Sequence, residues 1–312
     1  MKKLRSIQLN ITNTCAQRCE MCRKYEWPRD VLPVGDLLAV VEALDPATTV
    51  ILSGGDPLMH PQIDEILSAL RGRGLHWAIL TNGLVYNDDL DGCSYINLSL
   101  DGATRETYRR VRGVDTFERV MGNIERYVGR YPNVPIMLDS TISTLNMNEL
   151  PDLLRIASQL KVEINFQTVH TFDDLMPTNE DWKRILPMAT QVQAELRPKS
   201  NLFIFMNSIF NGYPTSERCS AIDSHCVVDS DGSVFPCCRA LNDNGAYENR
   251  ASEWVSGNIR TGKIEDAWNN AQTSSLLDPL RSKCGSFCSQ CDRYVMFNSF
   301  KERYMDAEVL FL

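Results

Sequence analysis

The sequence predicts an α/β fold built on a parallel β-sheet, and two observations support that prediction. Six short runs rich in β-branched and apolar residues alternate with longer stretches whose apolar residues have helical spacing. The short runs hold β-branched and apolar residues, as buried parallel strands do. Six βα units in series favour right-handed crossovers. The pattern alone leaves open whether the sheet forms part of a barrel or a doubly wound sheet.

The expected elements follow one another along the first two thirds of the chain. The predicted strands are Ser6–Thr12, Thr48–Ser53, His76–Thr81, Tyr95–Leu100, Ile136–Ile142 and Val162–Val169. The predicted helices are Val34–Leu44, Pro61–Arg71, Phe117–Tyr131, Met147–Leu160 and Asn179–Leu196. Pro61 suits a first helical turn, where a missing N–H costs nothing.

The rhythm changes after about residue 200, which predicts a second domain. Asn201–Met206 is expected to form one more strand, and Cys226–Cys237 has a hairpin pattern with Asp231-Gly232 as its turn. Helices are expected at Lys263–Asn270, Ser274–Arg281 and Tyr294–Ala307. We therefore divide the chain into a domain of residues 1–206 and a smaller domain of residues 207–312.

Composition narrows the class of protein. The chain has 312 residues, 43% of them hydrophobic, so a full core is expected. A net charge of −8 argues against a broad nucleic-acid interface, which needs clustered Lys and Arg. No apolar run is long enough for a transmembrane helix, and the basic start lacks the long apolar segment of a signal peptide. We expect a cytoplasmic protein.

The distribution of the eleven cysteines predicts two separate metal sites. Cytosolic thiols stay reduced, so they more often bind metal or take part in chemistry than form disulfides. Cys15, Cys19 and Cys22 lie together just after the first predicted strand, Cys93 stands alone, and the other seven follow residue 218. A short loop can present three thiolates to one four-iron, four-sulfur (4Fe–4S) cluster and leave its fourth iron open. The alternatives are a zinc ion with a distant fourth ligand or a chance group of buried thiols.

Three further segments lie at the ends of successive predicted strands. They are Ser53-Gly54-Gly55-Asp56-Pro57, Thr81-Asn82-Gly83 and Ser99-Leu100-Asp101-Gly102. Each alone would indicate only a tight turn. With the cysteine spacing, they resemble the radical S-adenosylmethionine (radical SAM) superfamily. The resemblance implies a partial (β/α)6 barrel with a SAM-binding 4Fe–4S cluster on Cys15, Cys19 and Cys22.

The resemblance also implies which residues contact SAM. They are Met21, Gly54, Gly55, Asp56, Thr81, Asn82, Ser99, Asp101 and Arg112. Asp56 replaces a glutamate of the family's motif, and the segment around it would hold the SAM amino group. Arg112 would bind the SAM carboxylate, because a guanidinium can grip a carboxylate with two N–H groups. The alternative for Arg112 is a solvated side chain beside Arg109 and Arg110.

The later cysteines resemble the auxiliary-cluster domains called SPASM and, in shortened form, twitch. The resemblance implies a second 4Fe–4S cluster on Cys219, Cys237, Cys288 and Cys291. Cys284 could replace Cys219, or could join Cys226 in a further partial cluster. A zinc ion on the same four cysteines is the alternative, since the C-x2-C spacing also suits zinc.

Candidate catalytic residues come from the inner ends of later strands and from the remaining cysteines. Asp139 lies on the fifth predicted strand, and His170 follows the sixth as a possible proton acceptor. Asp139 could instead pair with Arg112, and His170 could be structural. Cys238 could give a hydrogen atom to a substrate radical, as in radical epimerases, or could be a buried small apolar residue.

The leading hypothesis is a radical SAM oxidoreductase, a dehydrogenase or an epimerase. The cysteine spacing resembles an aminocyclitol dehydrogenase group of the superfamily, which implies a sugar-like or aminocyclitol-like substrate. A peptide substrate is the first alternative. The family implies a reductant of the flavodoxin or ferredoxin type. A hypothesis from another class is a non-catalytic iron–sulfur or zinc scaffold.

Overall fold

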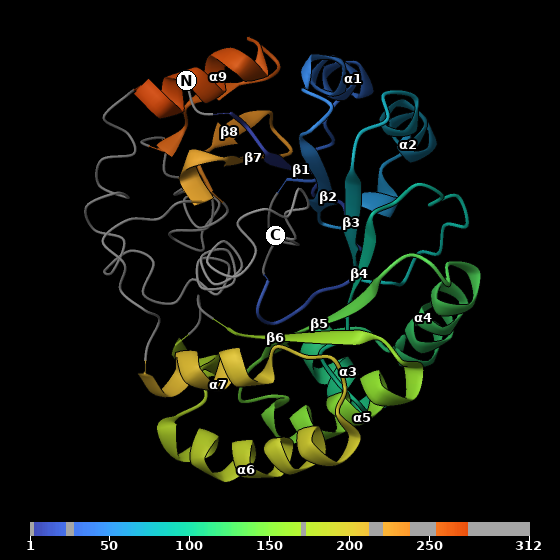
Figure 1. The fold of residues 1–312 in the computed structure, drawn as a ribbon, viewed down its shortest axis with the longest axis vertical. Helices are drawn as coiled ribbons and strands as arrows, with labels where there is room; N and C mark the ends of the chain where they lie inside the picture. Colours follow the sequence, from blue (N-terminus) through green and yellow to red (C-terminus); the bar gives the residue numbers. More distant parts are fainter. Residues whose placement is uncertain (1–2, 23–27, 170–172, 212–220, 238–253, 274–312) are drawn as a thin grey trace. The chain divides into compact units, whose positions relative to one another are not determined.

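The computed structural model describes residues 3–22, 28–169, 173–211, 221–237 and 254–273 (Figure 1). The chain forms two compact units. The first comprises residues 1–14, 27–78 and 211–312, and the second comprises residues 15–26 and 79–210. The chain passes from the first unit into the second after Thr14 and again within strand β3 (Trp77–Thr81).

The first unit contains five strands of a sheet, and β1 is an internal strand with a neighbour on each side. Its strands are β1 (Ser6–Thr12), β2 (Thr49–Gly54), β7 (His225–Val228), β8 (Ser233–Phe235) and β9 (Gly257–Asn258). Ser6 pairs in parallel with Thr49 on one side and with His225 on the other. Strands β7 and β8 form the predicted antiparallel hairpin, and β9 extends it. The hairpin from the C-terminal part of the sequence therefore continues the sheet that the N-terminal strand begins.

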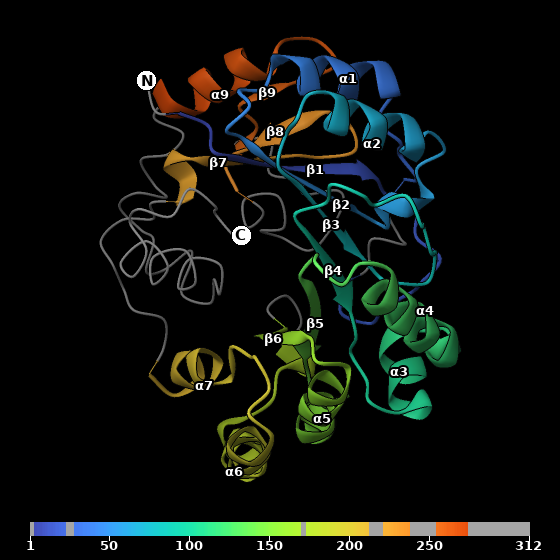
Figure 2. The same ribbon diagram turned by 45° about the vertical axis from the view of Figure 1, so that its right-hand side comes forward.

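Helices cover this sheet along one side (Figure 2). They are α1 (Val34–Ala43), α2 (Ile63–Gly72) and α9 (Ile264–Thr273). In α2 the buried residues are Ile63, Ile66, Leu67 and Leu70, which lie on one face at helical spacing. That apolar face explains why the segment forms a helix here.

Every residue of β1 is buried, and its two faces differ in character. Ile7, Leu9 and Ile11 alternate with polar side chains that are also buried. Asn10 Nδ2 donates to Asp229 Oδ1 at 3.2 Å, and Asn10 Oδ1 accepts from Gln8 Nε2. Burying these polar groups is tolerable because they are hydrogen-bonded.

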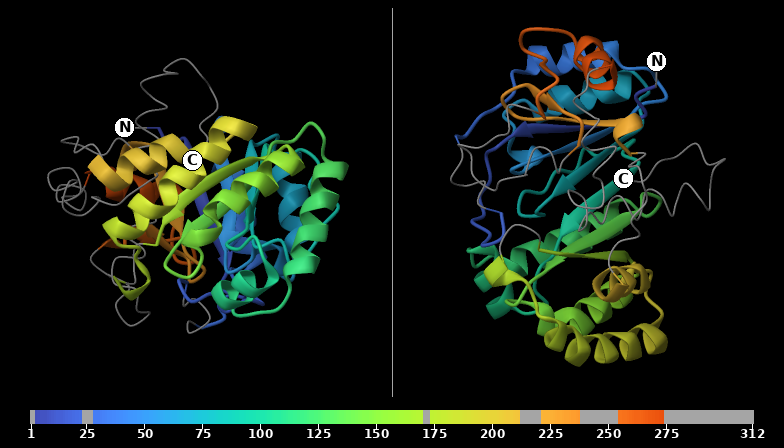
Figure 3. Two further views of the ribbon diagram at one scale, coloured as in Figure 1. Left: turned by 90° about the horizontal axis from the view of Figure 1, so that it is seen from below. Right: turned by 90° about the vertical axis from the view of Figure 1, so that its left-hand side faces the viewer.

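The second unit contains a parallel sheet and a set of helices (Figures 1 and 3). Its paired strands are β4 (Tyr95–Ser99), β5 (Ile136–Ile142) and β6 (Glu163–Thr168). Its helices are α3 (Arg105–Arg112), α4 (Phe117–Arg130), α5 (Leu150–Leu160), α6 (Asn179–Leu196) and α7 (Leu202–Asn211). Helix α5 packs against both α6 and β6.

The two faces of β4, β5 and β6 have different polarity. Leu138 and Ile142 on β5, with Ile164 and Phe166 on β6, are buried. On β5 and β6 the alternate residues are at most half-buried and, apart from Met137, polar, as at Asp139, whereas Asn97 on β4 is buried. Alternation of this kind sets side chains on opposite faces of a sheet. One face is therefore a core, and the other carries most of the polar side chains.

The predicted α/β fold with parallel strands is confirmed. All six strands expected before residue 170 are present, and Ser6–Thr12 and Ile136–Ile142 have the predicted ends. The five helices expected in the first two thirds of the chain are present too, and α2 begins two residues later than predicted, at Ile63. In neither unit do the described strands close into a complete barrel.

The expected strand Asn201–Met206 is wrong, because this segment begins helix α7. The chain pairs with β6 only briefly, through a single bridge between Ile164 and Ser200. The Asn201 side chain then imitates a strand partner, because its amide accepts from the Phe166 N–H and donates to the Phe166 carbonyl. Short apolar runs do not distinguish a buried strand from a buried helix.

Among the described helices none is long and apolar enough to cross a membrane. The predicted helices Ser274–Arg281 and Tyr294–Ala307 lie outside the described residues. The division of the chain after residue 206 stays a prediction.

Candidate functional site

The cysteine loop is held against the C-terminal end of α3. The Arg18 N–H donates to the Arg112 carbonyl at 3.1 Å, and the Glu20 N–H donates to the Val111 carbonyl at 3.0 Å. The last carbonyls of a helix have no partner within the helix, so they are natural acceptors for a loop. The backbone of the loop is thereby tied to one structural element.

Gly113 makes this contact possible. It ends α3 with φ +68°, a left-handed conformation that glycine adopts without strain. A Cβ atom here would lie 2.4 Å from the Arg18 carbonyl oxygen. The helix therefore ends in a glycine both for its backbone conformation and for the room that the cysteine loop needs.

Gly113→Ala is expected to destabilise the cysteine loop in addition to the C-terminal end of α3. The positive φ alone costs a non-glycine residue about 1–2 kcal/mol. Gly74→Ala is the matched control, because Gly74 has φ +64° and nothing lies within 4 Å of its Cβ position. We expect Gly113→Ala to show the larger loss in unfolding free energy and a lower iron content. Equal stability and iron content in both variants would contradict this role of Gly113.

The three loop thiols differ in exposure. Cys15 is half-buried, Cys19 is buried and Cys22 is exposed, and none of them forms a disulfide in the described part of the chain. Burial raises the pKa of the Cys19 thiol to about 12, and the Arg112 guanidinium acts against this effect. No group of three Cys, His, Asp or Glu side chains in the described residues has the arrangement of ligands around a single metal ion.

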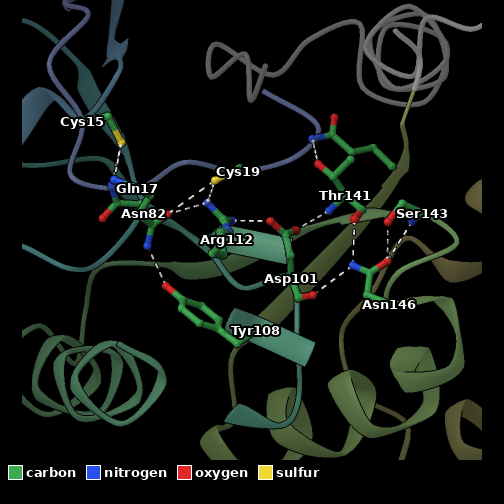
Figure 4. A network of polar contacts seen from close by, with 11 residues as sticks. Cys15, Gln17, Cys19, Asn82, Asp101, Tyr108, Arg112, Thr141, Ser143 and Asn146 are labelled. Atoms are coloured by element: carbon green, nitrogen blue, oxygen red, sulfur yellow. Dashed lines mark hydrogen bonds and ion pairs between the residues drawn. The ribbon is translucent and has the colours of Figure 1, made fainter. Parts of the chain in front are cut away.

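Nitrogen donors point at two of the sulfur atoms (Figure 4). Cys15 Sγ accepts from Asn82 Nδ2 and from the Gln17 backbone N–H, each at 3.4 Å. Cys19 Sγ accepts from Arg112 Nη1 at 3.7 Å. Donors of this kind favour the negatively charged thiolate over the neutral thiol.

The buried side chain of Gln17 connects the cysteine loop to α3. Its Nε2 donates to the Tyr108 hydroxyl at 2.7 Å, and its Oε1 accepts from Arg112 Nη1 at 3.1 Å. The Gln17 side chain is only 2% exposed. It therefore fixes the distance between the loop and the guanidinium.

Arg112 and Asp101 form a buried ion pair at the centre of the network (Figure 4). Arg112 Nη2 lies 2.5 Å from Asp101 Oδ2, and both side chains are largely excluded from solvent. Burial raises the pKa of the Asp101 carboxyl, opposed by Arg112 and by the Thr141 N–H, which donates to Asp101 at 2.7 Å. Burial alone would lower the pKa of Arg112, and the Asp101 carboxylate reverses that effect. The guanidinium is therefore held in its charged form.

The segment Thr81-Asn82-Gly83 is a rigid turn. Thr81 Oγ1 accepts from the Gly83 N–H, and Asn82 Oδ1 accepts from the Leu84 N–H at 2.8 Å. Asn123 on α4 donates to the Gly83 carbonyl at 2.8 Å. Hydrogen bonds within the turn and from Asn123 therefore hold its backbone, and the Asn82 amide has a fixed orientation.

In the first unit, Gly54 and Gly55 let two backbone segments approach each other. A Cβ at Gly54 would lie 2.2 Å from the Thr12 carbonyl oxygen, and one at Gly55 would lie 2.5 Å from that of Thr14. The Gly55 N–H donates to Thr12, and the Asp56 N–H donates to Thr14. Asp56 is fully buried, and its carboxylate accepts from the Leu58 N–H.

Two expectations about Arg112 are wrong. The solvated side chain is excluded, because Arg112 is buried and bonded. The pairing with Asp139 is also wrong, because Arg112 pairs with Asp101. Asp139 instead accepts from Asn97 Nδ2 at 2.6 Å.

The other predicted site residues lie as follows. Ser99, Met21 and Cys237 are half-buried, whereas Cys93 and Cys226 are buried. His170 and the remaining later cysteines lie outside the described residues, namely Cys219, Cys238, Cys284, Cys288 and Cys291.

Sequence reasoning missed the supporting residues of the site. They are Gln17, Tyr108, Asn123 and Asn146. Asn146 donates to both the Asp101 and the Thr141 carbonyls and so joins the two strand ends. Nothing in the sequence separates these residues from ordinary polar positions. The missed helix α3 had a signal, since Thr104 caps its start and Gly113 ends it.

The residues of the loop fit an iron–sulfur cluster by their chemistry. Thiolates are the usual ligands of such clusters, and hydrogen bonds to the sulfur atoms are a known means of tuning them. Here the loop supplies three closely spaced thiols, and N–H groups already lie at two of their sulfur atoms.

The α/β fold and the loop with three cysteines define the class of α/β proteins that bind an iron–sulfur cluster. A model of the radical SAM superfamily matches residues 9–155, and a model of the SPASM iron–sulfur cluster-binding domain matches residues 219–292. The chain belongs to the radical SAM superfamily and carries a C-terminal SPASM domain. Its cofactors are SAM, the SAM-binding 4Fe–4S cluster and an auxiliary iron–sulfur cluster. The zinc and scaffold alternatives find no support.

Three known proteins illustrate the likeness. An AdoMet-dependent heme synthase from Methanosarcina barkeri is 27% identical over 328 residues, which cover 90% of this chain and 87% of the synthase. The structure of Streptococcus suis SuiB bound to SAM has a TM-score of 0.69 at 15% identity, covering 93% of this chain and 72% of SuiB. The structure of anSMEcpe with bound SAM has a TM-score of 0.66 at 14% identity, covering 96% of this chain and 92% of anSMEcpe. At these identities the two structures support the fold alone.

Proposed function

We propose that this radical SAM enzyme oxidises or epimerises a polar small molecule of the sugar or aminocyclitol kind, with its SAM-binding cluster held by Cys15, Cys19 and Cys22. When bound, that cluster supplies the electron that cleaves SAM to a 5′-deoxyadenosyl radical, which takes a hydrogen atom from the substrate. The observation that supports this substrate class is the polar face of β4, β5 and β6.

This face presents neutral polar groups and carboxylates in register. Ser99, Asp139 and Asn165 lie side by side across the three strands. One row further on, Gln167 Nε2 donates to Thr141 Oγ1 at 3.0 Å. Groups of this kind bind hydroxyls and amines by donating and accepting hydrogen bonds.

The carboxylate of Asp139 is the strongest candidate for moving a proton. It is half-buried, and Asn97 Nδ2 orients one of its oxygens. A positioned carboxylate can accept the proton of a substrate hydroxyl when the neighbouring carbon is oxidised. His170 and Cys238 stay predictions for the same reaction.

Several residues are proposed to bind SAM. Gly54, Gly55 and Asp56 would hold its amino group. Arg112 would bind its carboxylate, because Arg112 Nε is buried and has no acceptor among the described residues. Met21, Thr81, Ser99 and Asp101 remain proposed for the rest of SAM.

A peptide is the second candidate substrate. Asn97, Asn165 and Gln167 bring amides to the same face, and amides pair well with peptide groups. A heme-type substrate, as the name of the Methanosarcina relative would suggest, fits less well. Heme bears carboxylate arms, and β4, β5 and β6 contribute no Lys or Arg to bind them.

The proposal is tested by following deuterium. The anaerobic enzyme is reduced with dithionite, or with flavodoxin or ferredoxin, and given SAM with perdeuterated sugars, aminocyclitols or peptides. We expect deuterated 5′-deoxyadenosine with the sugars or aminocyclitols. Deuterium transfer from peptides alone would overturn the proposed substrate class.

The same reaction in D2O separates the two outcomes for the substrate. An epimerase would return a solvent-exchangeable hydrogen to carbon, so its product would contain deuterium. A dehydrogenase would yield a product two hydrogens lighter than the substrate, without deuterium on that carbon.

A further inference from the structure

We propose that the side chains of Asn82 and Arg112 donate hydrogen bonds to the sulfur atoms of two cluster ligands, Cys15 and Cys19, and thereby raise the reduction potential of the cluster. The inference rests on the proposed assignment of these cysteines as ligands. It gives both side chains a positioning and tuning role that is separate from contact with SAM.

Asn82 is placed for this role by its own turn. Its Oδ1 accepts from the Leu84 N–H at 2.8 Å, so the Nδ2 group must point to the other side, where Cys15 Sγ lies at 3.4 Å. The side chain is only 6% exposed, so little water competes for the amide. Asn123 holds the turn through the Gly83 carbonyl. The donor is therefore fixed before any cluster is bound.

Arg112 is fixed in the same manner at the second sulfur. Asp101 holds one end of the guanidinium at 2.5 Å, and Gln17 accepts from Nη1 at 3.1 Å. The same Nη1 lies 3.7 Å from Cys19 Sγ (Figure 4). Asp101 and Gln17 together leave the guanidinium little freedom to turn away from the sulfur.

The physical effect follows from charge. Reduction adds an electron to the cluster, and part of the added charge resides on its sulfur ligands. N–H groups directed at those sulfurs stabilise the reduced form more than the oxidised form, which raises the potential. In a buried site the interaction is stronger than in water. Loss of the donor should therefore make the cluster harder to reduce.

Asn82→Asp tests the inference most directly. The substitution keeps an oxygen for the Leu84 N–H and replaces the donor to Cys15 by a carboxylate oxygen. Asn87→Asp is the matched control, because Asn87 Oδ1 also accepts a backbone N–H, that of Asp89, at 2.7 Å. Both are measured as cluster-loaded full-length enzyme without SAM, by redox titration followed by electron paramagnetic resonance. The relevant signal is the one missing from the Cys15, Cys19 and Cys22 alanine variant.

At the wild-type midpoint potential, we expect the ratio of reduced to oxidised cluster to fall at least tenfold in Asn82→Asp. For a one-electron couple this equals a shift of about 59 mV to lower potential. The control should keep the wild-type potential. An unchanged potential in Asn82→Asp with full iron content would overturn the inference.

Two further measurements keep the test decisive. If Asn82→Asp does not load iron, Asn82→Ser is titrated instead, since serine keeps an oxygen near the Leu84 N–H and lacks the amide donor. If Asn82→Ser keeps the wild-type potential, or unfolds with the loss of its iron, the inference is wrong. If the alanine variant of the three cysteines keeps every cluster signal, the assignment of the ligands fails instead.

Discussion

A full-length variant with Cys15, Cys19 and Cys22 all replaced by alanine is expected to form no detectable 5′-deoxyadenosine from SAM. Thiolates are the usual ligands of iron–sulfur clusters, and the loop supplies three of them close together. Loss of all three removes the cluster that reduces SAM. The auxiliary site should keep its own iron, so total iron should fall from about eight to about four per chain.

Liquid chromatography with mass spectrometry measures the 5′-deoxyadenosine, and a colorimetric assay measures iron. Cys93→Ala is the control, because Cys93 is a buried thiol that donates to the Tyr95 carbonyl. Burial also raises the pKa of the Cys93 thiol to about 12, so it remains a neutral side chain. The control should retain cleavage and all its iron. Cleavage of SAM by the triple variant would refute the ligand assignment.

The fold was predictable where apolar and β-branched residues recur through a short segment. Ser6–Thr12 and Ile136–Ile142 are two such segments, and both were predicted with their observed ends. Prediction failed at Leu202–Asn211, whose apolar run suits a strand as well as a helix. Its start depends on Asn201 bonding to β6, a contact between residues 35 apart in sequence. Such a contact has no local signature.

The site was predictable only where its residues lie close together in the sequence. Three cysteines within one loop form a pattern that spacing reveals, and so do the turns at strand ends. The partner of Arg112 was not predictable, because Asp101 and Asp139 both follow or lie on strands of the same sheet. The structure decides for Asp101, which accepts Arg112 and the Thr141 N–H together. Gln17 is buried only because α3 lies against the loop.

The glycines of the second motif show the limit of reasoning by residue type. Gly54 and Gly55 suggested room for a ligand near the backbone. The structure fills that room with the backbone of Thr12 and Thr14. The need for glycine is therefore explained within the first unit, and the contact of this segment with SAM remains a proposal.

Asp101→Asn is expected to cause the largest loss of stability of any single charge change in the second unit. The amide keeps an oxygen for the Thr141 N–H, so the change removes mainly the negative charge. Arg112 is then left charged and buried without its carboxylate. Breaking one partner of a buried ion pair typically costs about 3–5 kcal/mol. Anaerobic urea unfolding of the full chain, followed by circular dichroism, measures the change.

Asp115→Asn is the matched control, because Asp115 pairs with Arg105 at 2.6 Å on the exposed side of the same helix. Water screens that pair, so its loss should change stability far less. A double variant, Asp101→Asn with Arg112→Met, should recover most of the loss, since it leaves no buried charge and keeps an oxygen for the Thr141 N–H. The double variant still lacks the Arg112 N–H that donates to Cys19 Sγ. Its unfolding free energy should therefore recover, while the reduction potential of its cluster should stay below that of the wild type. If Asp101→Asn is no less stable than Asp115→Asn, the pair does not hold the site together.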